Sequence, residues 1–193
     1  MKRKSKILSK KKLIRKNALI KRKKISINSY YASFAAMKYF FRCFSVSKDD
    51  VIGCYWPIQD ELDTRPLISE LIKKKIKIAL PVILDNCMLF KSWNINDSLF
   101  FSKYKFYGPS MKASTLKPNI IITPALAVDL KGNRIGYGKG FYDKYYNNHK
   151  SENYVGYSYS QQIFKTLPFN QHDLKLNTVV TDNFVKIIKN ENK

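Results

Sequence analysis

A short segment in which glycine takes every second position carries the clearest chemical signal in the chain. It reads Arg134-Ile135-Gly136-Tyr137-Gly138-Lys139-Gly140-Phe141-Tyr142-Asp143. Glycine lets the backbone approach a ligand closely and adopt a positive φ, so successive N–H groups can line a concave site for an anion. Arg134 and Lys139 add positive charges, and Asp143 stands where Mg²⁺ could meet a carboxylate and phosphate oxygens. The segment therefore predicts a phosphate-binding loop.

The spacing of this segment excludes two common phosphate loops. A Walker A loop ends in Gly-Lys followed by Ser or Thr, and a dinucleotide loop spaces its glycines as GxGxxG at the start of a βαβ unit. Neither pattern fits glycines at 136, 138 and 140. A flexible surface turn is the other interpretation, but a Lys, an Arg and an Asp within ten residues favour phosphate binding.

The residues on either side of the loop predict a strand before it and a helix after it. Residues 120–122 are an apolar run that stops at Pro124, as a buried strand would. A helix is expected over residues 141–149, directly after the last glycine. Strand, glycine-rich loop and helix start together suit an anion, because a helix N-terminus adds partial positive charge.

A βαβ unit is expected earlier in the chain. Its parts are a strand at 51–56, a helix at 66–75 that Thr64 would cap, and a strand at 77–83. This order requires a parallel sheet. Residues 94–118 look irregular, with a turn at Gly108-Pro109. Further strands are expected at 88–93, 154–158, 178–181 and 184–188. The predicted class is α/β.

Length and composition limit the possible classes of protein. With 193 residues, the chain fits one domain spanning 1–193 with a full core. No apolar run approaches the roughly 20 residues of a membrane-spanning helix, so no membrane partner is expected. Cys43, Cys54 and Cys87 form no CxxC pair that would suggest zinc or a disulfide framework. The expected location is a reducing cytoplasm.

The formal net charge of +22 is concentrated near the N-terminus, where residues 1–48 hold 16 of the 36 Lys and Arg residues and no Asp or Glu. Three explanations are open: nucleic-acid binding, an anionic ligand such as a nucleotide or a polyglutamate, and the codon bias of an AT-rich genome. We favour codon bias for the bulk of the charge and an anionic ligand for a few positions. Nucleic acid is not the expected partner, because no aromatic residues alternate with the basic ones.

Two helices are expected in this basic region. Residues 6–24 suggest an amphipathic helix with apolar residues at Ile7, Leu8, Ile14, Ala18 and Leu19. Lys11, Arg15 and Arg22 fall near one another on it, at i, i+4 and i+11, although a solvated face is the more common fate of such residues. The second helix would begin at Asn28 or Ser29 and reach about residue 43. Its expected core side is Tyr31, Phe34, Ala35, Tyr39 and Phe40.

Four blocks in order resemble the 5-formyltetrahydrofolate cyclo-ligase family, also called methenyltetrahydrofolate synthetases. The first block is Lys11-Lys12-Leu13-Ile14-Arg15. The second is Glu61-Leu62-Asp63-Thr64, followed by a helix and Leu80-Pro81. The third runs from Pro124 through Ala127-Val128-Asp129 to the glycine-rich segment. The fourth comprises Gln161 or Gln162, Leu167-Pro168, His172-Asp173 and Val179-Val180-Thr181. One block alone is weak, but four with sensible spacing make the resemblance strong over nearly the whole chain.

The resemblance implies a three-layer α/β/α fold with a mostly parallel sheet, similar to the ribose-5-phosphate isomerase and CoA-transferase group (NagB/RpiA/CoA-transferase-like). It also implies an ATP- and Mg²⁺-dependent ligase that converts 5-formyltetrahydrofolate into 5,10-methenyltetrahydrofolate, with ADP and phosphate. In the family's proposed mechanism the formyl oxygen attacks the γ-phosphate of ATP, N10 closes the ring and phosphate departs. The expected partners are these two small molecules, and a monomer is expected.

The resemblance further implies roles for individual residues. The metal ligands would be Asp143 and Asp173, and the catalytic residues Arg134, Lys139 and Tyr142. The ATP-binding residues would be Lys11, Arg15, Arg134, Ile135, Gly136, Tyr137, Gly138, Lys139, Gly140, Phe141 and Tyr142. The folate-binding residues would be Trp56, Glu61, Tyr137, Gly138, Lys139, Gly140 and Phe141.

Several of these roles have a plainer structural alternative. Glu61 could be a solvated loop acid, although its carboxylate would suit the paired N–H donors of a pterin. Trp56 could be a core residue rather than a surface for the pterin ring. Asp143 could simply face the helix dipole, and Asp173 could be a turn carboxylate beside His172. The aromatic side chains at the helix start could equally belong to the core.

Three positions depart from the family pattern. Gly108 stands where a Glu precedes the proline, Phe141 stands where Tyr is usual, and Val128 replaces a Phe. The second change removes one hydroxyl, and the third is interpreted as repacking. The departure at Gly108 leaves open a homologue that binds folate or nucleotide without turnover. The basic residues 1–24 leave open a nucleic-acid-binding protein, although such a protein would need neither the glycine loop nor the acidic loop.

Overall fold

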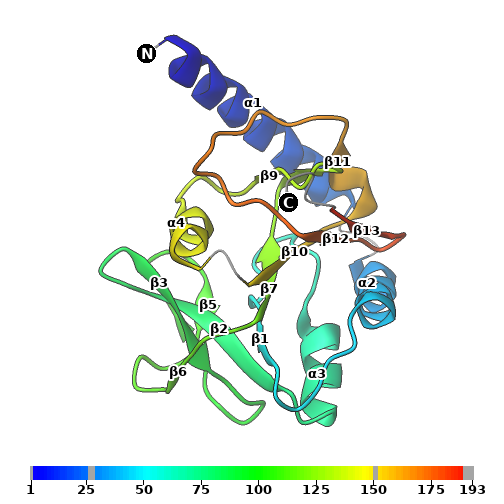
Figure 1. The fold of residues 1–193 in the computed structure, drawn as a ribbon, viewed down its shortest axis with the longest axis vertical. Helices are drawn as coiled ribbons and strands as arrows, with labels where there is room; N and C mark the ends of the chain where they lie inside the picture. The colour runs from blue at the N-terminus through cyan, green and yellow to red at the C-terminus, as the bar shows by residue number, and fades with distance from the viewer. Residues whose placement is uncertain (1, 26–28, 150–151, 189–193) are drawn as a thin grey trace, which may run out of the picture.

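An eight-stranded sheet forms the centre of the computed structural model, which describes residues 2–25, 29–149 and 152–188 (Figure 1). The strand order is β13-β12-β10-β7-β1-β2-β3-β6. The five central strands run parallel: β12 (Thr178–Val180), β10 (Asn153–Tyr157), β7 (Ile120–Pro124), β1 (Val51–Gly53) and β2 (Lys77–Leu84). The antiparallel edges are β13 (Val185–Ile187) on one side and β3 (Cys87–Ser92) with β6 (Thr115–Leu116) on the other. The predicted mostly parallel α/β sheet is confirmed.

Apolar side chains cover both faces of the parallel strands, as such sheets require. In β7, Ile120 and Ile122 join the core on one face and Ile121 joins the core on the other. Helices α2 (Ser29–Cys43) and α3 (Arg65–Lys73) cover the first face, and α4 (Phe141–Asn148) covers the second (Figure 1). The layers are therefore helix, sheet and helix.

The predicted βαβ unit is β1, α3 and β2, with Val51 opposite Lys77 in parallel register. Strand β1 is shorter than expected and ends at Gly53, because the chain leaves the sheet to form a loop. Thr64 precedes α3, but its hydroxyl does not cap the helix. It donates instead to the Tyr55 carbonyl at 2.6 Å. Thr64 thereby ties the loop after β1 to the start of α3.

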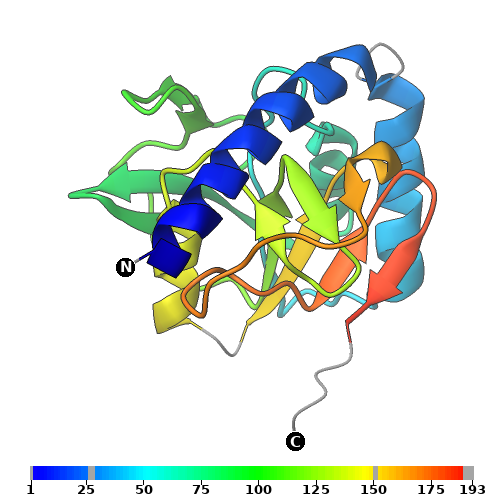
Figure 2. The ribbon, with the colours of Figure 1, turned by 90° about the horizontal axis from the view of Figure 1, so that it is seen from above.

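The inward side of helix α1 (Lys2–Ile25) combines buried cations with the predicted apolar residues Ile14 and Ala18. Lys11 and Arg22 are 5% and 1% exposed, whereas Leu8 and Leu19 are 54% and 38% exposed. Helix α1 lies across the end of the sheet where β7 stops (Figures 1 and 2). It contacts the short strands β8 and β9 there. A solvated face for the basic residues was therefore the wrong interpretation, because this end offers polar backbone and acidic side chains.

The core side of α2 also differs from the prediction. Its buried residues are Ser33, Ala36 and Phe40. Tyr31 is 78% exposed and Phe34 is 37% exposed, so only part of the expected stripe faces the core. The apolar residues of α2 surround the helix on more than one side, and the sequence alone therefore did not fix which side packs. Asn28, a possible start of the helix, lies outside the described residues.

A small second sheet supports the glycine-rich segment. Its strands are β11 (Ile163–Phe164), β8 (Ala127–Asp129) and β9 (Arg134–Ile135), in that order. The turn between β8 and β9 closes on the fully buried Asp129, whose carboxylate accepts hydrogen bonds from the backbone N–H groups of Lys131, Asn133 and Leu167. From the 3₁₀ helix η2 (Ser160–Gln162), Gln162 donates to the carbonyls of Ala125 and Leu126. These bonds fix the chain immediately before the glycines.

Residues 94–118 contain a hairpin that the sequence did not predict. Strands β4 (Phe100–Phe101) and β5 (Tyr107–Gly108) pair antiparallel. The expected turn at Gly108 is wrong, because Gly108 lies in β5. A Cβ there would lie 2.6 Å from the Pro81 carbonyl oxygen, so β5 comes too close to β2 for a side chain. Within the described part of the chain, no helix has the length and hydropathy to cross a membrane.

Candidate functional site

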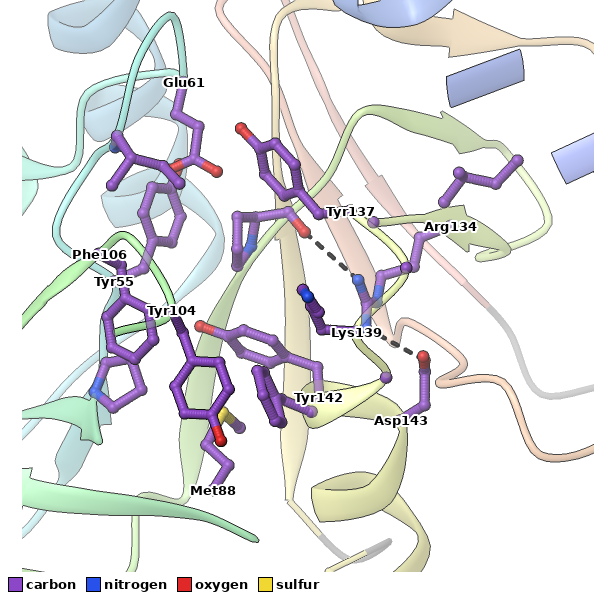
Figure 3. A pocket seen from close by; sticks show the side chains of 18 of the residues that line it. Tyr55, Glu61, Met88, Tyr104, Phe106, Arg134, Tyr137, Lys139, Tyr142 and Asp143 are labelled. Carbon is purple, nitrogen blue, oxygen red and sulfur yellow. Dashed lines mark hydrogen bonds and ion pairs between the residues drawn. The ribbon is translucent and has the colours of Figure 1, made fainter. Parts of the chain in front are cut away.

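A cavity of about 360 Å³ opens where β1 and β7 end, beside the inward face of α1 (Figure 3). From β1 the chain crosses to β2 on one side of the sheet, and from β7 it crosses to β10 on the other side. Adjacent strands whose connections diverge leave a crevice at their carboxyl ends, where open α/β sheets bind their ligands. The fold therefore places its main crevice beside the glycine-rich loop.

Every residue that the sequence assigned to ATP, folate or metal lines this one cavity. These residues are Lys11, Arg15, Trp56, Glu61, Arg134, Ile135, Gly136, Tyr137, Gly138, Lys139, Gly140, Phe141, Tyr142, Asp143 and Asp173. They come from α1, from the loop after β1, from β9 with its loop, from α4 and from the loop before β12. The structure brings these distant segments together, whereas their roles with ligands stay predictions.

Sequence reasoning missed other lining residues: Tyr55, Ile58, Gln59, Pro81, Ile83, Met88, Tyr104, Lys105, Phe106 and Pro124. Those near Trp56 and Glu61 could have been found, because they share a loop at the end of β1. The three from the β4–β5 hairpin carried no signal, since the hairpin itself was not predicted. Tyr104 packs edge-on against Phe141 with ring centroids 4.9 Å apart, so the hairpin closes one wall of the cavity.

A different physical feature distinguishes the position of each of the three glycines in the loop. Gly136 makes room for Arg134, because a Cβ there would lie 2.7 Å from the Arg134 Nη1 atom. Gly138 has a φ of +97° and lies against the Arg15 guanidinium. Gly140 has a φ of +74°, and a Cβ there would have no atom within 4 Å. Gly140 therefore borders open space immediately before α4, where a phosphate could approach the helix N-terminus.

Arg134 and Asp143 form an ion pair at the edge of this loop. Arg134 Nη2 lies 3.1 Å from Asp143 Oδ1, which also accepts the backbone N–H of Leu174 at 3.0 Å. Figure 3 shows Arg134 held between this carboxylate and the Pro124 carbonyl. Its guanidinium carbon lies 5.4 Å from the centre of the Tyr142 ring. Arg134 is 8% exposed, so water screens its charge little and the charge interacts strongly with other groups in the site.

Two cations reach the cavity from α1. Lys11 Nζ pairs with Asp173 Oδ2, which also accepts the backbone N–H of Asn170. Arg15 Nε donates to the Gly136 carbonyl at 2.9 Å. With Arg134 and the exposed Lys139, whose side chain points from the loop into the cavity in Figure 3, one half of the site is cationic. This half can neutralise a polyanion such as a triphosphate.

Asp143 and Asp173 can contribute to a magnesium site only together with ligand oxygens. Among the described residues, no three His, Cys, Asp or Glu side chains gather as a metal cluster. The hydrogen bonds of these two carboxylates use Asp143 Oδ1 and Asp173 Oδ2, so the other oxygen of each faces no donor in the described chain. Mg²⁺ usually binds one or two carboxylates together with phosphate oxygens and water. The carboxylate oxygens of Asp143 and Asp173 therefore fit such a magnesium site.

The opposite half of the cavity is mostly apolar, with Gln59, Glu61 and Lys105 among the polar side chains of its loop and hairpin. Trp56, Met88, Tyr104, Phe106 and Phe141 line it. Trp56 lines the cavity and also packs edge-on against the core residue Trp93, so it belongs to the core edge and the cavity wall at once, while its contact with a folate stays a prediction. Flat aromatic surfaces in this half suit a planar ring.

Glu61 is buried, so it is not a solvated loop acid. It is 7% exposed, and its Oε2 accepts the Ile58 backbone N–H at 3.0 Å. Burial raises the pKa of Glu61 to about 7, opposed by the Ile58 N–H, the charge of Arg22 and a hydrogen bond from Tyr137. A buried carboxylate at the end of an apolar pocket can accept paired N–H donors from a ring. Such hydrogen bonds are stronger than in water because Glu61 is buried.

Tyr142 lies between the two halves. Its hydroxyl is buried and has no hydrogen-bond partner among the described residues. Burial raises the pKa of Tyr142 well above its usual range, so the phenol stays protonated at neutral pH. The Tyr142 hydroxyl can therefore donate a hydrogen bond to a ligand but cannot act as a base at neutral pH.

Comparisons with known proteins agree on one family. Residues 7–182 match the model of the 5-formyltetrahydrofolate cyclo-ligase family. The 5-formyltetrahydrofolate cyclo-ligase of Escherichia coli K12 is 31% identical over 139 residues, which cover 67% of this chain and 76% of that protein. The cyclo-ligase of Haemophilus influenzae is 28% identical, over 65% of this chain and 72% of that protein.

Solved structures show the same similarity in three dimensions. The NMR structure of the 5,10-methenyltetrahydrofolate synthetase of Aquifex aeolicus superposes with a TM-score of 0.77 and 26% identity, covering 95% of both chains. A 5,10-methenyltetrahydrofolate synthetase from Mycoplasma pneumoniae, at 19% identity and a TM-score of 0.71, shares the fold over 89% of this chain and 98% of that one. With a family match over residues 7–182 and this fold, the chain belongs to the 5-formyltetrahydrofolate cyclo-ligase family of ligases.

Proposed function

We propose that this protein converts 5-formyltetrahydrofolate into 5,10-methenyltetrahydrofolate with ATP and Mg²⁺, releasing ADP and phosphate. The observation that carries the proposal is the division of one cavity into a cationic half around Lys139 and an apolar half that ends at Glu61. A reaction between a triphosphate and a reduced folate needs both halves in contact. Family membership supplies the class of reaction.

The cationic half suits the triphosphate of ATP. Lys11 and Arg15 approach from α1, and Arg134 and Lys139 approach from the loop. Phosphoryl transfer asks a protein mainly for positioning and for neutralisation of charge on the transferring group. Lys139 suits the transferring phosphate because, unlike Lys11 and Arg134, it forms no ion pair within the described residues.

The apolar half suits the pteridine ring and the aromatic part of the folate. Glu61 would accept the ring N–H and the exocyclic amino group, which fixes the orientation of the ring. Trp56 and Phe141 border the same space. An ionised carboxylate is the better acceptor for two donors, so folate binding should depend on the ionisation of Glu61.

The proposed reaction has two steps. The formyl oxygen attacks the γ-phosphorus, its bond to phosphorus forms and ADP leaves. N10 of the folate then attacks the formyl carbon and loses its proton, and the carbon–oxygen bond breaks as phosphate departs. Lys139 and Arg134 would stabilise negative charge on the transferring group. The Tyr142 hydroxyl, a protonated donor without a partner in the described chain, could bind a developing oxyanion.

Asp143 and Asp173 would hold Mg²⁺ together with phosphate oxygens of ATP. When bound, the ion supplies positive charge that neutralises the phosphates.

We also propose that the protein works in the cytoplasm, since Cys43, Cys54 and Cys87 are all free thiols and a reducing compartment keeps thiols in that form.

The proposal is tested by turnover of the purified protein. With ATP, Mg²⁺ and 5-formyltetrahydrofolate, we expect a product that absorbs in the near ultraviolet, as the methenyl group does. Omission of ATP, or addition of EDTA, should abolish it. A folded protein that binds both ligands but forms no product would instead be a non-catalytic relative.

A further inference from the structure

Arg22 is buried where α1 meets the folate half of the cavity. It lies two helical turns beyond Arg15 on the same inward side and is 1% exposed. Its Nη2 atom donates to the Tyr137 hydroxyl, and its guanidinium carbon lies 5.4 Å from the centre of that ring. Its Nε and Nη1 atoms are buried and have no hydrogen-bond partner in the described chain.

Packing alone does not account for an arginine at this position. A buried guanidinium with unpaired N–H groups costs several kcal/mol of desolvation unless an opposite charge compensates it. A methionine or leucine could fill similar space without that cost. The compensating charge must therefore be sought among the groups that face Arg22 and Tyr137.

Glu61 is that charge. The groups that act on its carboxylate come from several elements: the Ile58 N–H from its own loop, the Tyr137 hydroxyl from the glycine loop, and Arg22 from α1. The phenols of Tyr55 and Tyr142 also interact with it and stay protonated at neutral pH. Arg22 is the one full positive charge among these groups. Tyr137 lies between the two, because its hydroxyl accepts from Arg22 and points toward the Glu61 carboxylate, whose pKa it lowers (Figure 3).

We propose that Arg22 is a positioning residue of the folate site, which holds Tyr137 against Glu61 and supplies the positive charge that keeps the Glu61 carboxylate an anion for the pteridine. Arg22 itself need not touch the folate. Its unpaired N–H groups are buried, and its effect passes through Tyr137 and through space. This inference rests on the proposed folate site at Glu61.

Removal of the Arg22 charge has a defined consequence. Burial raises the pKa of Glu61 to about 7 even with Arg22 present. Without that charge the pKa should rise further, by about one pH unit, since a nearby opposite charge commonly shifts a carboxyl group by that much or more. At pH 7 the ionised fraction of Glu61 would then fall about fivefold. Folate affinity should fall by a similar factor and recover as the pH is raised.

The experiment compares Arg22→Gln with two matched variants. Gln removes the charge but can still donate to Tyr137. Arg22→Lys keeps the charge, and Lys24→Gln removes a charge from an exposed position on the same helix. The titration of Glu61 is followed in the ligand-free proteins by ¹³C NMR of the glutamate carboxyls, with Glu61→Gln to assign its signal. The dissociation constant of 5-formyltetrahydrofolate is measured without ATP between pH 6 and 9.

We expect Arg22→Gln to raise the Glu61 midpoint by about one pH unit and to weaken folate binding about fivefold at pH 7, with recovery by pH 9. Arg22→Lys and Lys24→Gln should keep the wild-type midpoint. An unmoved midpoint in folded Arg22→Gln would overturn the inference, and so would equal shifts in Lys24→Gln. If Arg22→Gln does not fold, Arg22→Met decides, because it removes the charge and fills similar space. It should raise the Glu61 midpoint as well, and an unmoved midpoint in it would overturn the inference. Failure of the wild-type protein to bind folate at any pH would refute the proposed function, while the NMR titration would still report on Arg22 and Glu61.

Discussion

Arg15 and Gly138 lie so close together that a Cβ on the glycine would lie 3.2 Å from the Arg15 guanidinium carbon. The same arginine donates from Nε to the neighbouring Gly136 carbonyl. Helix α1 and the glycine loop are thus fitted to each other through a backbone that has no side chain at the point of contact. The geometry of the cationic half depends on this fit.

Gly138→Ala should weaken ATP binding more than it weakens the fold. The φ of +97° should cost about 1–2 kcal/mol for alanine, and the new methyl group would displace Arg15. Arg15→Ala and the double variant Arg15→Ala/Gly138→Ala are the comparison, because a methyl group cannot displace a side chain that is absent. We expect Gly138→Ala to raise the KM for ATP clearly when Arg15 is present and little when it is absent. Equal increases in the two backgrounds would show that the Arg15 contact is unimportant.

Lys139→Ala should reduce kcat by about 10²–10³-fold, the usual effect of removing a group that stabilises transition-state charge. Its melting temperature should stay close to wild type, since the side chain is exposed and forms no ion pair within the described residues. Lys144→Ala, which removes an exposed lysine from α4, is the control and should keep wild-type kcat. A loss of stability in Lys139→Ala that matches its loss of rate would argue for a structural role.

Glu61→Gln should make the protein more stable at pH 8 while it weakens folate binding. The folded pKa of Glu61 is about 7, above the value of 4.5 for the unfolded chain. Between these values the folded state holds a proton that the unfolded state has lost, so this group's contribution to stability falls as the pH rises from about 4.5 to 7. Glutamine does not titrate, so Glu61→Gln avoids this loss of stability. Its free energy of unfolding should exceed that of wild type by up to roughly 3 kcal/mol at pH 8.

Urea unfolding of both proteins at pH 5 and pH 8 measures this difference. Glu70→Gln is the control, because Glu70 forms a surface pair with Lys73 at 3.5 Å and should change stability by less than about 1 kcal/mol at either pH. A stability difference between Glu61→Gln and wild type that does not change with pH would mean that Glu61 titrates normally in the folded protein.

Asp143→Asn should raise the Mg²⁺ concentration needed for half-maximal rate by about tenfold or more. Asn keeps an oxygen that can accept the Leu174 N–H, so the loop should hold its position. It loses the charge that pairs with Arg134 and that would bind the metal. Turnover measured across a Mg²⁺ titration, with the melting temperature as control, tests this role. An unchanged Mg²⁺ dependence would place the metal elsewhere.

The parallel sheet and the glycine-rich loop could be predicted from the sequence because both rest on local patterns. The run at Ile120–Pro124, the glycines and the βαβ order each have a short-range cause. Glu61 and Asp173 could not be placed by any local pattern. Resemblance to a family supplied them, and the structure brings both to the cavity.

What the sequence could not predict depends on tertiary contact. The inward side of α1 carries buried cations as well as apolar residues, because carbonyls and carboxylates such as Asp173 lie among its neighbours. Composition alone made Arg22 look like one more solvated charge. The hairpin of β4 and β5 was missed because its strands have two residues each, too few to show alternation.

The most direct test of the central claim follows the formyl oxygen through the reaction. Wild-type protein is given ATP, Mg²⁺ and 5-formyltetrahydrofolate labelled with ¹⁸O in the formyl group, and the products are measured together. We predict one ADP for each methenyl product, with the label in the released inorganic phosphate. Absence of methenyl product would contradict cyclo-ligase activity in this chain, and label released in water would contradict phosphorylation of the formyl oxygen.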